Sequence, residues 1–166
     1  MIQSSSVILL VDDDENDVFF LKKALHQAGI RQSIQVLRDG EAAIDYLAGT
    51  APFGDRLKYP LPCLVLLDTN MPKKSGMEVL KWLRQQAQFK DLPVFMTTSS
   101  GKTGDIDAAN KYGIRAFLTK PLDYQHLVIL VREFLLEADA VCQESAAPGE
   151  PPPCAKATAP FPAMDR

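Results

Sequence analysis

The sequence has few of the features that mark exported, membrane-spanning or nucleic-acid-binding proteins. Its three cysteines, at positions 63, 142 and 154, form neither an even set for disulfides nor a metal-spaced pair. No apolar run approaches the ~20 residues of a membrane span, and no basic segment followed by an apolar run opens the chain. Blocks of Lys and Arg never exceed two residues, and the net charge is -3. We therefore expect a cytoplasmic protein that binds neither nucleic acid nor membranes.

The length of 166 residues suits one domain with a sizeable core, followed by a tail. From residue 142 the chain is rich in Pro and Ala and has few large apolar side chains, so it cannot bury enough surface to offset its conformational entropy. We expect a folded domain over residues 1–141 and a disordered tail over 142–166, with no room for a second globular module. Residues 49–62, with three prolines and two glycines, are expected to form a long surface loop.

Short apolar runs alternate with segments of helical periodicity. The predicted strands are 7–11, 33–37, 63–67, 93–97 and 115–119, and the predicted helices are 15–28, 40–48, 75–88, 104–112 and 123–140. This alternation is typical of βαβ units, and strands that are apolar throughout indicate a parallel sheet covered on both faces. The sequence thus predicts an α/β fold with a doubly wound, five-stranded parallel sheet.

Polar residues follow four of the predicted strands, and in such sheets ligands bind beyond the carboxyl ends of the strands. They are Asp12 with Asp13, Asp68 with Asn70, Thr98 with Ser99, and Lys120 with Pro121. Two carboxylates ~5 Å apart repel by roughly 3 kcal/mol at an effective dielectric of ~20. Acids converging at one edge therefore need a cation, and carboxylate and carbonyl oxygens are ligands that Mg²⁺ prefers.

Each of these residues also has a simpler interpretation. Asp14, which follows the acidic pair, can serve only as the N-cap of the next helix. Asp68 can cap a turn, Thr98 suits a strand by propensity alone, and a single Lys at a strand end can be solvated. Together, however, they are what a carboxylate needs to accept a phosphoryl group: a nucleophile, a metal, a fixed cation and a hydrogen-bond donor.

Four motifs, "LLVDDD", "LVLLDTNMPKKSGMEVL", "PVFMTTSS" and "FLTKP", resemble those of response-regulator receiver domains, the phosphoacceptors of two-component systems. The likeness covers about residues 6–138, and Asp68, Thr98 and Lys120 are separated by 30 and 22 residues, as in the chemotaxis regulator CheY. The resemblance implies a CheY-like, flavodoxin-like (βα)5 fold with strand order 2-1-3-4-5.

The resemblance also implies a role for each residue of the acidic cluster. Asp68 is the expected phosphorylation site. Asp13 is expected to coordinate Mg²⁺ directly, Asp12 to act mainly through a bound water, and Asn70 to contribute its backbone carbonyl.

Four further residues take roles from the same resemblance. Thr98 and Lys120 are expected to contact the phosphoryl oxygens, and the Lys120-Pro121 bond is expected to be cis. Phe117 stands where the family commonly has the aromatic residue that turns inward when the Thr moves toward the phosphoryl group; its alternative is an ordinary strand side chain.

The function implied is that of a single-domain response regulator. It would accept a phosphoryl group from a sensor histidine kinase on Asp68, catalyse its own phosphorylation and dephosphorylation, and signal through protein contacts without being a kinase. Its first helix, the 49–62 loop and "LDTNMPKKSG" are similar to regulators paired with bacterial phytochromes. The alternatives are a phosphatase like the haloacid dehalogenases, disfavoured because Asn70 replaces their second acid, and a degenerate receiver that acts as a constitutive adaptor.

Helical periodicity indicates two exposed apolar surfaces. Ile129 and Leu136, beside Val128, fall on the side of the last helix opposite its core arc and are expected to form a homodimer face. On the first helix we expect Phe20 to face the core and Phe19 to point outward as a docking contact for the kinase.

Overall fold

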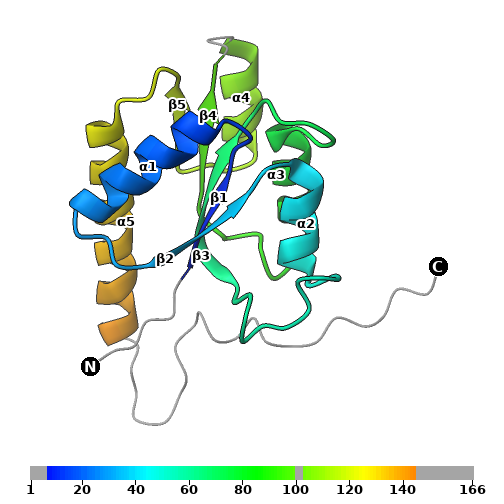
Figure 1. Cartoon of the computed structure of the whole chain (residues 1–166), viewed down its shortest axis with the longest axis horizontal. Helices are drawn as coiled ribbons and strands as arrows, with labels where there is room; N and C mark the ends of the chain where they lie inside the picture. Colours follow the sequence, from blue (N-terminus) through cyan, green and yellow to red (C-terminus); the bar gives the residue numbers. More distant parts are fainter. Residues whose placement is uncertain (1–6, 100–102, 145–166) are drawn as a thin grey trace, which may run out of the picture.

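The computed structural model describes residues 7–99 and 103–144, in which strands and helices alternate (Figure 1). The strands are β1 (Val7–Val11), β2 (Ser33–Leu37), β3 (Pro62–Asp68), β4 (Val94–Thr98) and β5 (Ala116–Thr119). The helices are α1 (Glu15–Gln27), α2 (Gly40–Ala48), α3 (Gly76–Gln85), α4 (Thr103–Lys111) and α5 (Tyr124–Glu144).

The strands form one parallel sheet in the order β2-β1-β3-β4-β5, which confirms the predicted fold class and strand order. In Figure 1, α1 and α5 lie on one side of this sheet, and α2 and α3 lie on the other. Ala109 of α4 packs in the same core cluster as α2 and α3. The sheet is thus the middle layer of three.

Burial on both faces explains why the strands are apolar throughout. All five residues of β1 and all five of β4 are buried. Successive side chains of a strand point to opposite faces, so Leu9 and Val11 join the core beneath α2 and α3, whereas Ile8 and Leu10 join the core beneath α1 and α5. A polar residue at the end of such a strand is therefore held by a rigid, close-packed support.

The ends of α3 and α5 differ from the prediction. Helix α3 ends at Gln85, three residues early, because Gln86 has an extended backbone and the chain then turns. That turn allows Phe89, which is 3% exposed, to pack against Trp82 with ring centroids 6.1 Å apart. Helix α5 continues to Glu144, beyond the predicted end at 140. Residues 145–166 of the predicted tail lie outside the described residues, so the domain boundary at 141 stays a prediction.

The prediction that Phe20 faces the core is wrong. Its side chain is 48% exposed, and its ring lies 6.1 Å from that of Tyr124, at the first position of α5. Phe20 lies at the margin of the apolar face of α1, where a side chain contacts the neighbouring helix rather than the sheet. Phe20 therefore lines the space between α1 and α5 instead of the core beneath them.

The loop before β3 follows the surface, as predicted, and is anchored by an arginine and an aromatic cluster. The Arg56 guanidinium donates to the carbonyl oxygens of Tyr46, Leu47 and Tyr59 at 2.7, 2.8 and 3.2 Å. The ring of Phe53 packs against those of Tyr46 and Tyr59. These contacts hold the loop against the end of α2.

No helix among the residues that the structure describes is both long enough and apolar enough to cross a membrane.

Gly76 lets α3 start directly against the end of β3. A Cβ at this position would overlap the carbonyl oxygen of Asp68. We expect Gly76→Ala to lower the free energy of unfolding by about 1–3 kcal/mol, because the backbone has to shift. Urea denaturation checks this, with Gly104→Ala as control, since an added methyl there meets no atom of the described residues within 4 Å. Equal stability of the two variants would contradict the close approach.

Candidate functional site

The carboxyl end of β1 turns into α1 through three aspartates with different environments. Asp12 is 4% exposed, and its Oδ1 accepts from the backbone N–H of Asp14 at 2.9 Å. Asp13 is exposed. The Asp14 side chain accepts from the N–H groups of Asn16 and Asp17 at 2.8 and 3.2 Å and is the N-cap of α1. The prediction that Asp14 caps the first helix is therefore confirmed.

Asp68 ends β3 beside this turn. Its pairing with β1 and β4 fixes the backbone, since Leu67 lies opposite Val11 and Asp68 opposite Thr97. The Asp68 side chain is 6% exposed, and its buried Oδ1 has no hydrogen-bond partner among the described residues. A buried carboxylate oxygen without a partner is costly. The hydrogen-bonding capacity of this oxygen is thus not used by the described residues.

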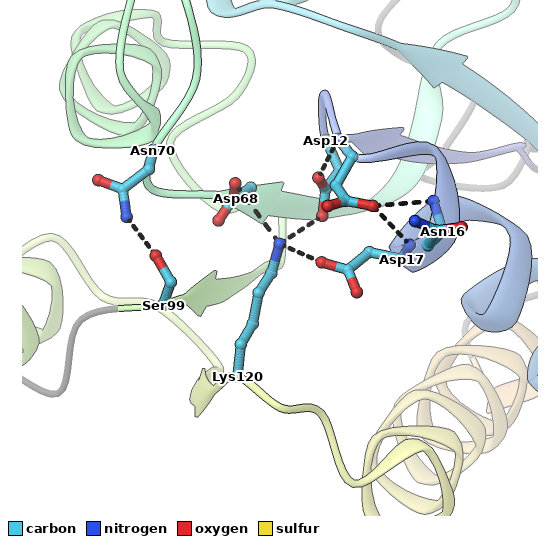
Figure 2. Close-up of polar contacts among 8 residues, drawn as sticks. Asp12, Asn16, Asp17, Asp68, Asn70, Ser99 and Lys120 are labelled. Carbon is cyan, nitrogen blue, oxygen red and sulfur yellow. Dashed lines mark hydrogen bonds and ion pairs between the residues drawn. The ribbon is translucent and has the colours of Figure 1, made fainter.

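The ammonium of Lys120 lies among three carboxylates (Figure 2). Its Nζ is 2.7 Å from Oδ2 of Asp17, 2.9 Å from Oδ2 of Asp12 and 3.6 Å from Oδ2 of Asp68. The backbone N–H of Lys120 donates to the carbonyl oxygen of Thr98 at 2.6 Å, which ties this residue to the end of β4. The Lys120-Pro121 peptide bond is cis, as the resemblance predicts.

Burial and charge shift the pKa values of the central pair in the same direction. Burial raises the pKa of Asp68 to about 6; the charges of Asp12 and Asp13 add to this shift, while Lys120 opposes it. For Lys120, burial acts to lower the pKa, but contacts with Asp17, Asp12 and Asp68 outweigh it and raise the pKa above its usual value. The site therefore keeps its cation charged and disfavours the charge on Asp68.

The donor set fits a hard divalent cation. Asp12, Asp13 and Asp68 each offer one carboxylate oxygen, and these atoms all lie within 4.8 Å of one another. The Oδ1 of Asp68, which has no hydrogen-bond partner among the residues that the structure describes, is a second indication that the cluster lacks a compensating positive charge. A few carboxylate oxygens, with the remaining positions left to water and phosphate, suit Mg²⁺. The residues present are thus compatible with the predicted metal.

Two predicted residues lie across the site from the acidic turn. Thr98 ends β4 and is fully buried. Asn70 is exposed, and its Nδ2 donates to Oγ of Ser99 at 3.0 Å (Figure 2), a bond that joins the loops after β3 and β4. The structure thus places Asp12, Asp13, Asp68, Asn70, Thr98 and Lys120 at one edge of the sheet.

The remaining predicted residues lie outside this cluster. Phe117 of β5 is partly buried and packs against the core beneath α2 and α3. Phe19, Ile129 and Leu136 are 60%, 53% and 63% exposed, as predicted, whereas Val128 is partly buried against the core beneath α5. Their proposed roles concern movement and partners and stay predictions.

Sequence reasoning missed Asp17, although this residue makes the shortest of the three contacts with Lys120. Its position gives one indication, because Asp17 lies in the first turn of α1, directly after the acidic turn formed by Asp12, Asp13 and Asp14. Its partner, however, lies 103 positions away in the chain. The helix dipole alone favours an acidic residue in the first turn of a helix, so the sequence does not indicate a contact between Asp17 and Lys120.

The family model of the response regulator receiver domain matches residues 8–132. Among curated relatives, the response regulator Rcp1 of Synechocystis sp. is 35% identical over 126 residues, which cover 76% of this chain and 84% of Rcp1. The response regulator Rre1 of the same organism is 35% identical over 135 residues, which cover 80% of this chain. The chain spans about half, 53%, of the length of Rre1.

Solved structures of similar proteins share the fold. The Mn(2+)-bound form of Rcp1 has a TM-score of 0.68 and 33% identity, covering 78% of this chain and 91% of that one. The bacteriophytochrome response regulator RtBRR has a TM-score of 0.69 and 31% identity, covering 91% of this chain and 86% of that one. Together with the match over residues 8–132, these likenesses show that the chain belongs to the response regulator receiver domain family.

Proposed function

We propose that this chain is a response-regulator receiver of the cytoplasm that accepts a phosphoryl group on Asp68 from a sensor histidine kinase. The observation that carries the proposal is the geometry at Asp68. Its Oδ1 is buried and has no hydrogen-bond partner within residues 7–99 and 103–144, while a metal-compatible acidic cluster and the Lys120 ammonium lie beside it. A nucleophile with a cation on each side is what phosphoryl transfer requires.

In the proposed reaction, a carboxylate oxygen of Asp68 attacks the phosphorus of a phosphohistidine. An O–P bond forms, the P–N bond breaks, and the released imidazole nitrogen takes a proton from solvent. Hydrolysis reverses the modification, because water attacks the phosphorus and restores the carboxylate and inorganic phosphate. The chain catalyses both steps on itself and transfers nothing onward as a kinase.

Each neighbouring residue has a part in this reaction. Asp13 and Asp68 would hold Mg²⁺ directly, Asp12 through a water, and Asn70 through its backbone carbonyl. When bound, the metal neutralises phosphoryl oxygens. Lys120 neutralises another oxygen, and the Thr98 hydroxyl donates a hydrogen bond. The position of Thr98 supports this role, because Thr98 is the last residue of β4 and Asp68 is the last residue of the neighbouring β3.

The proposed output is a change in protein contacts. Thr98 and Phe117 lie on neighbouring strands of the sheet, since Met96 of β4 is opposite Phe117 and Thr98 is opposite Thr119. Movement of Thr98 toward the phosphoryl group would leave space into which Phe117 turns. The partly buried position of Phe117 supports this role, because the ring has both a core contact and access to the surface.

Two surfaces are proposed for partners. Phe19, on the first turns of α1 close to the acidic edge, would contact the histidine kinase, and its 60% exposure supports this. The likeness to RtBRR supports a bacteriophytochrome as that kinase. Ile129 and Leu136, exposed two helical turns apart on α5 with Val128 at the margin, would form a homodimer face. Two large apolar side chains in line suit a helix-to-helix contact.

The two other functions considered from the sequence have less support. A haloacid-dehalogenase-like phosphatase carries its second acid two residues after the nucleophile, where this chain has Asn70, which contacts Ser99. A constitutive adaptor would not need the cluster of Asp12, Asp13 and Asp68 around a lysine. The receiver family match includes every residue of that cluster.

Incubation with acetyl phosphate and Mg²⁺ tests the proposed reaction. We expect an adduct of about 80 Da on Asp68, the mass of one phosphoryl group, detected by intact and peptide mass spectrometry. Asp68→Asn should remain unmodified, whereas the exposed Asp107→Asn should be modified like the wild type. Sustained hydrolysis of a phosphate monoester without any adduct would instead identify a phosphatase.

The raised pKa of Asp68 predicts how stability depends on pH without metal. A carboxyl group whose pKa rises from 3.8 to about 6 on folding binds its proton more tightly when folded, so this group's contribution to stability falls as pH rises from about 4 to 6. In EDTA at pH 7.5, Asp68→Asn should raise the free energy of unfolding by about 1–3 kcal/mol, and the gain should shrink toward pH 4. Urea denaturation of both proteins between pH 4 and pH 7.5 measures this difference in the free energy of unfolding. An Asp68→Asn variant less stable than the wild type at pH 7.5 would contradict the prediction.

For the dimer face, the double variant Ile129→Glu, Leu136→Glu should have a lower mass by light scattering than the wild type, with its circular dichroism unchanged. Buried glutamates at the interface would repel each other and lose their hydration. Leu57→Glu is the matched control, because Leu57 is 99% exposed in the loop before β3. A double variant with the same mass as the wild type would exclude this face.

A further inference from the structure

Asp17 shares the ammonium of Lys120 with the acids of the site. The Oδ2 of Asp17 is 2.7 Å from Nζ, whereas Oδ2 of Asp68 is 3.6 Å away. Asp17 is not one of the three residues in the metal-compatible cluster. Figure 2 shows it approaching the ammonium from α1, while Asp68 approaches from β3. A fourth carboxylate thus holds the cation on the side away from the proposed nucleophile.

The position of Asp17 is held from two directions. Its backbone N–H donates to the N-cap Asp14 at 3.2 Å in the first turn of α1. Its carboxylate lies near the Tyr124 hydroxyl, whose pKa is raised by burial and then by the charge of Asp17. The side chains of Asp17 and Lys120 are only 26% and 15% exposed, so water screens this pair less than it screens a surface pair.

We propose that Asp17 is a positioning residue that restrains the Lys120 ammonium and thereby slows phosphorylation of Asp68. This inference rests on the proposed function. An ammonium that is to contact the incoming phosphoryl oxygens has to give up part of its contact with Asp17. The free energy of that contact is subtracted from the stabilisation that Lys120 supplies to the transition state.

Removal of the charge tests the restraint. With acetyl phosphate and Mg²⁺, an oxygen of Asp68 attacks the phosphorus and acetate leaves. We expect full-length Asp17→Asn to form the adduct at least about threefold faster than the wild type, because the lysine is released from a partly shielded ion pair. If Asp17 had a purely structural role, loss of the ion pair would destabilise the fold, and the adduct would not form faster than in the wild type. Asp17→Glu, which keeps the charge, should remain near the wild-type rate.

Glu15→Gln is the matched control. It removes the same charge from the same helical turn, but Glu15 pairs with Arg38 at 3.4 Å. We expect its rate to equal that of the wild type, and an acceleration equal to that of Asp17→Asn would overturn the proposal by showing a general charge effect.

A second readout does not depend on activity. In a crystal structure of Asp17→Asn without metal, we expect the Nζ of Lys120 to lie closer than 3.6 Å to Oδ2 of Asp68. Two results would overturn the inference and leave the proposed function intact, provided that the wild type is phosphorylated on Asp68. One is an unchanged position of Lys120 in Asp17→Asn, and the other is a rate of adduct formation in Asp17→Asn at or below that of the wild type. A folded wild type that is not labelled on Asp68 would overturn both the inference and the proposed function.

Discussion

The ion contact between Lys120 and the carboxylates of Asp12, Asp17 and Asp68 is the interaction on which the site depends. Acids converge at this edge of the sheet because β1, β3 and the start of α1 all end or begin there. Their mutual repulsion would separate them if no cation were present. The lysine offsets part of that repulsion, and no residue in the described part of the chain forms a hydrogen bond with the Oδ1 of Asp68. The site therefore has more carboxylates than cationic side chains, which favours binding of a divalent cation.

The fold makes such an arrangement possible. Strands buried on both faces are hard to deform, so the polar residues at their ends cannot simply move apart into water. The close start of α3 at Gly76 and the cap of α1 at Asp14 fix the two segments that follow the acidic strands. Packing of the core thus keeps Asp68 buried at this end of the sheet, although burial of its carboxylate is unfavourable by itself. In the proposed reaction, the same support would position the carboxylate as the nucleophile and leave little reorganisation for the attack.

Most of the fold and the main acids were predictable, because both depend on local patterns. The apolar strands and the periodicity of the helices predict the α/β order, and Asp12, Asp68 and Lys120 each follow a strand. Phe20 was misplaced because a helical arc does not reveal where a neighbouring helix such as α5 lies. The bond from Asn70 to Ser99 and the contact of Asp17 with Lys120 join segments far apart in the chain. Such contacts depend on the relative position of folded elements, which no local pattern contains.

The carboxylates of Asp12, Asp13 and Asp68 should together bind one divalent cation. Isothermal titration calorimetry of the wild-type chain with Mg²⁺ measures this binding. We expect saturable binding of one ion per chain, lost in Asp13→Asn, whose exposed side chain can be changed without disturbing the core. Absence of Mg²⁺ binding by the folded wild type, or binding that persists unchanged in Asp13→Asn, would contradict it.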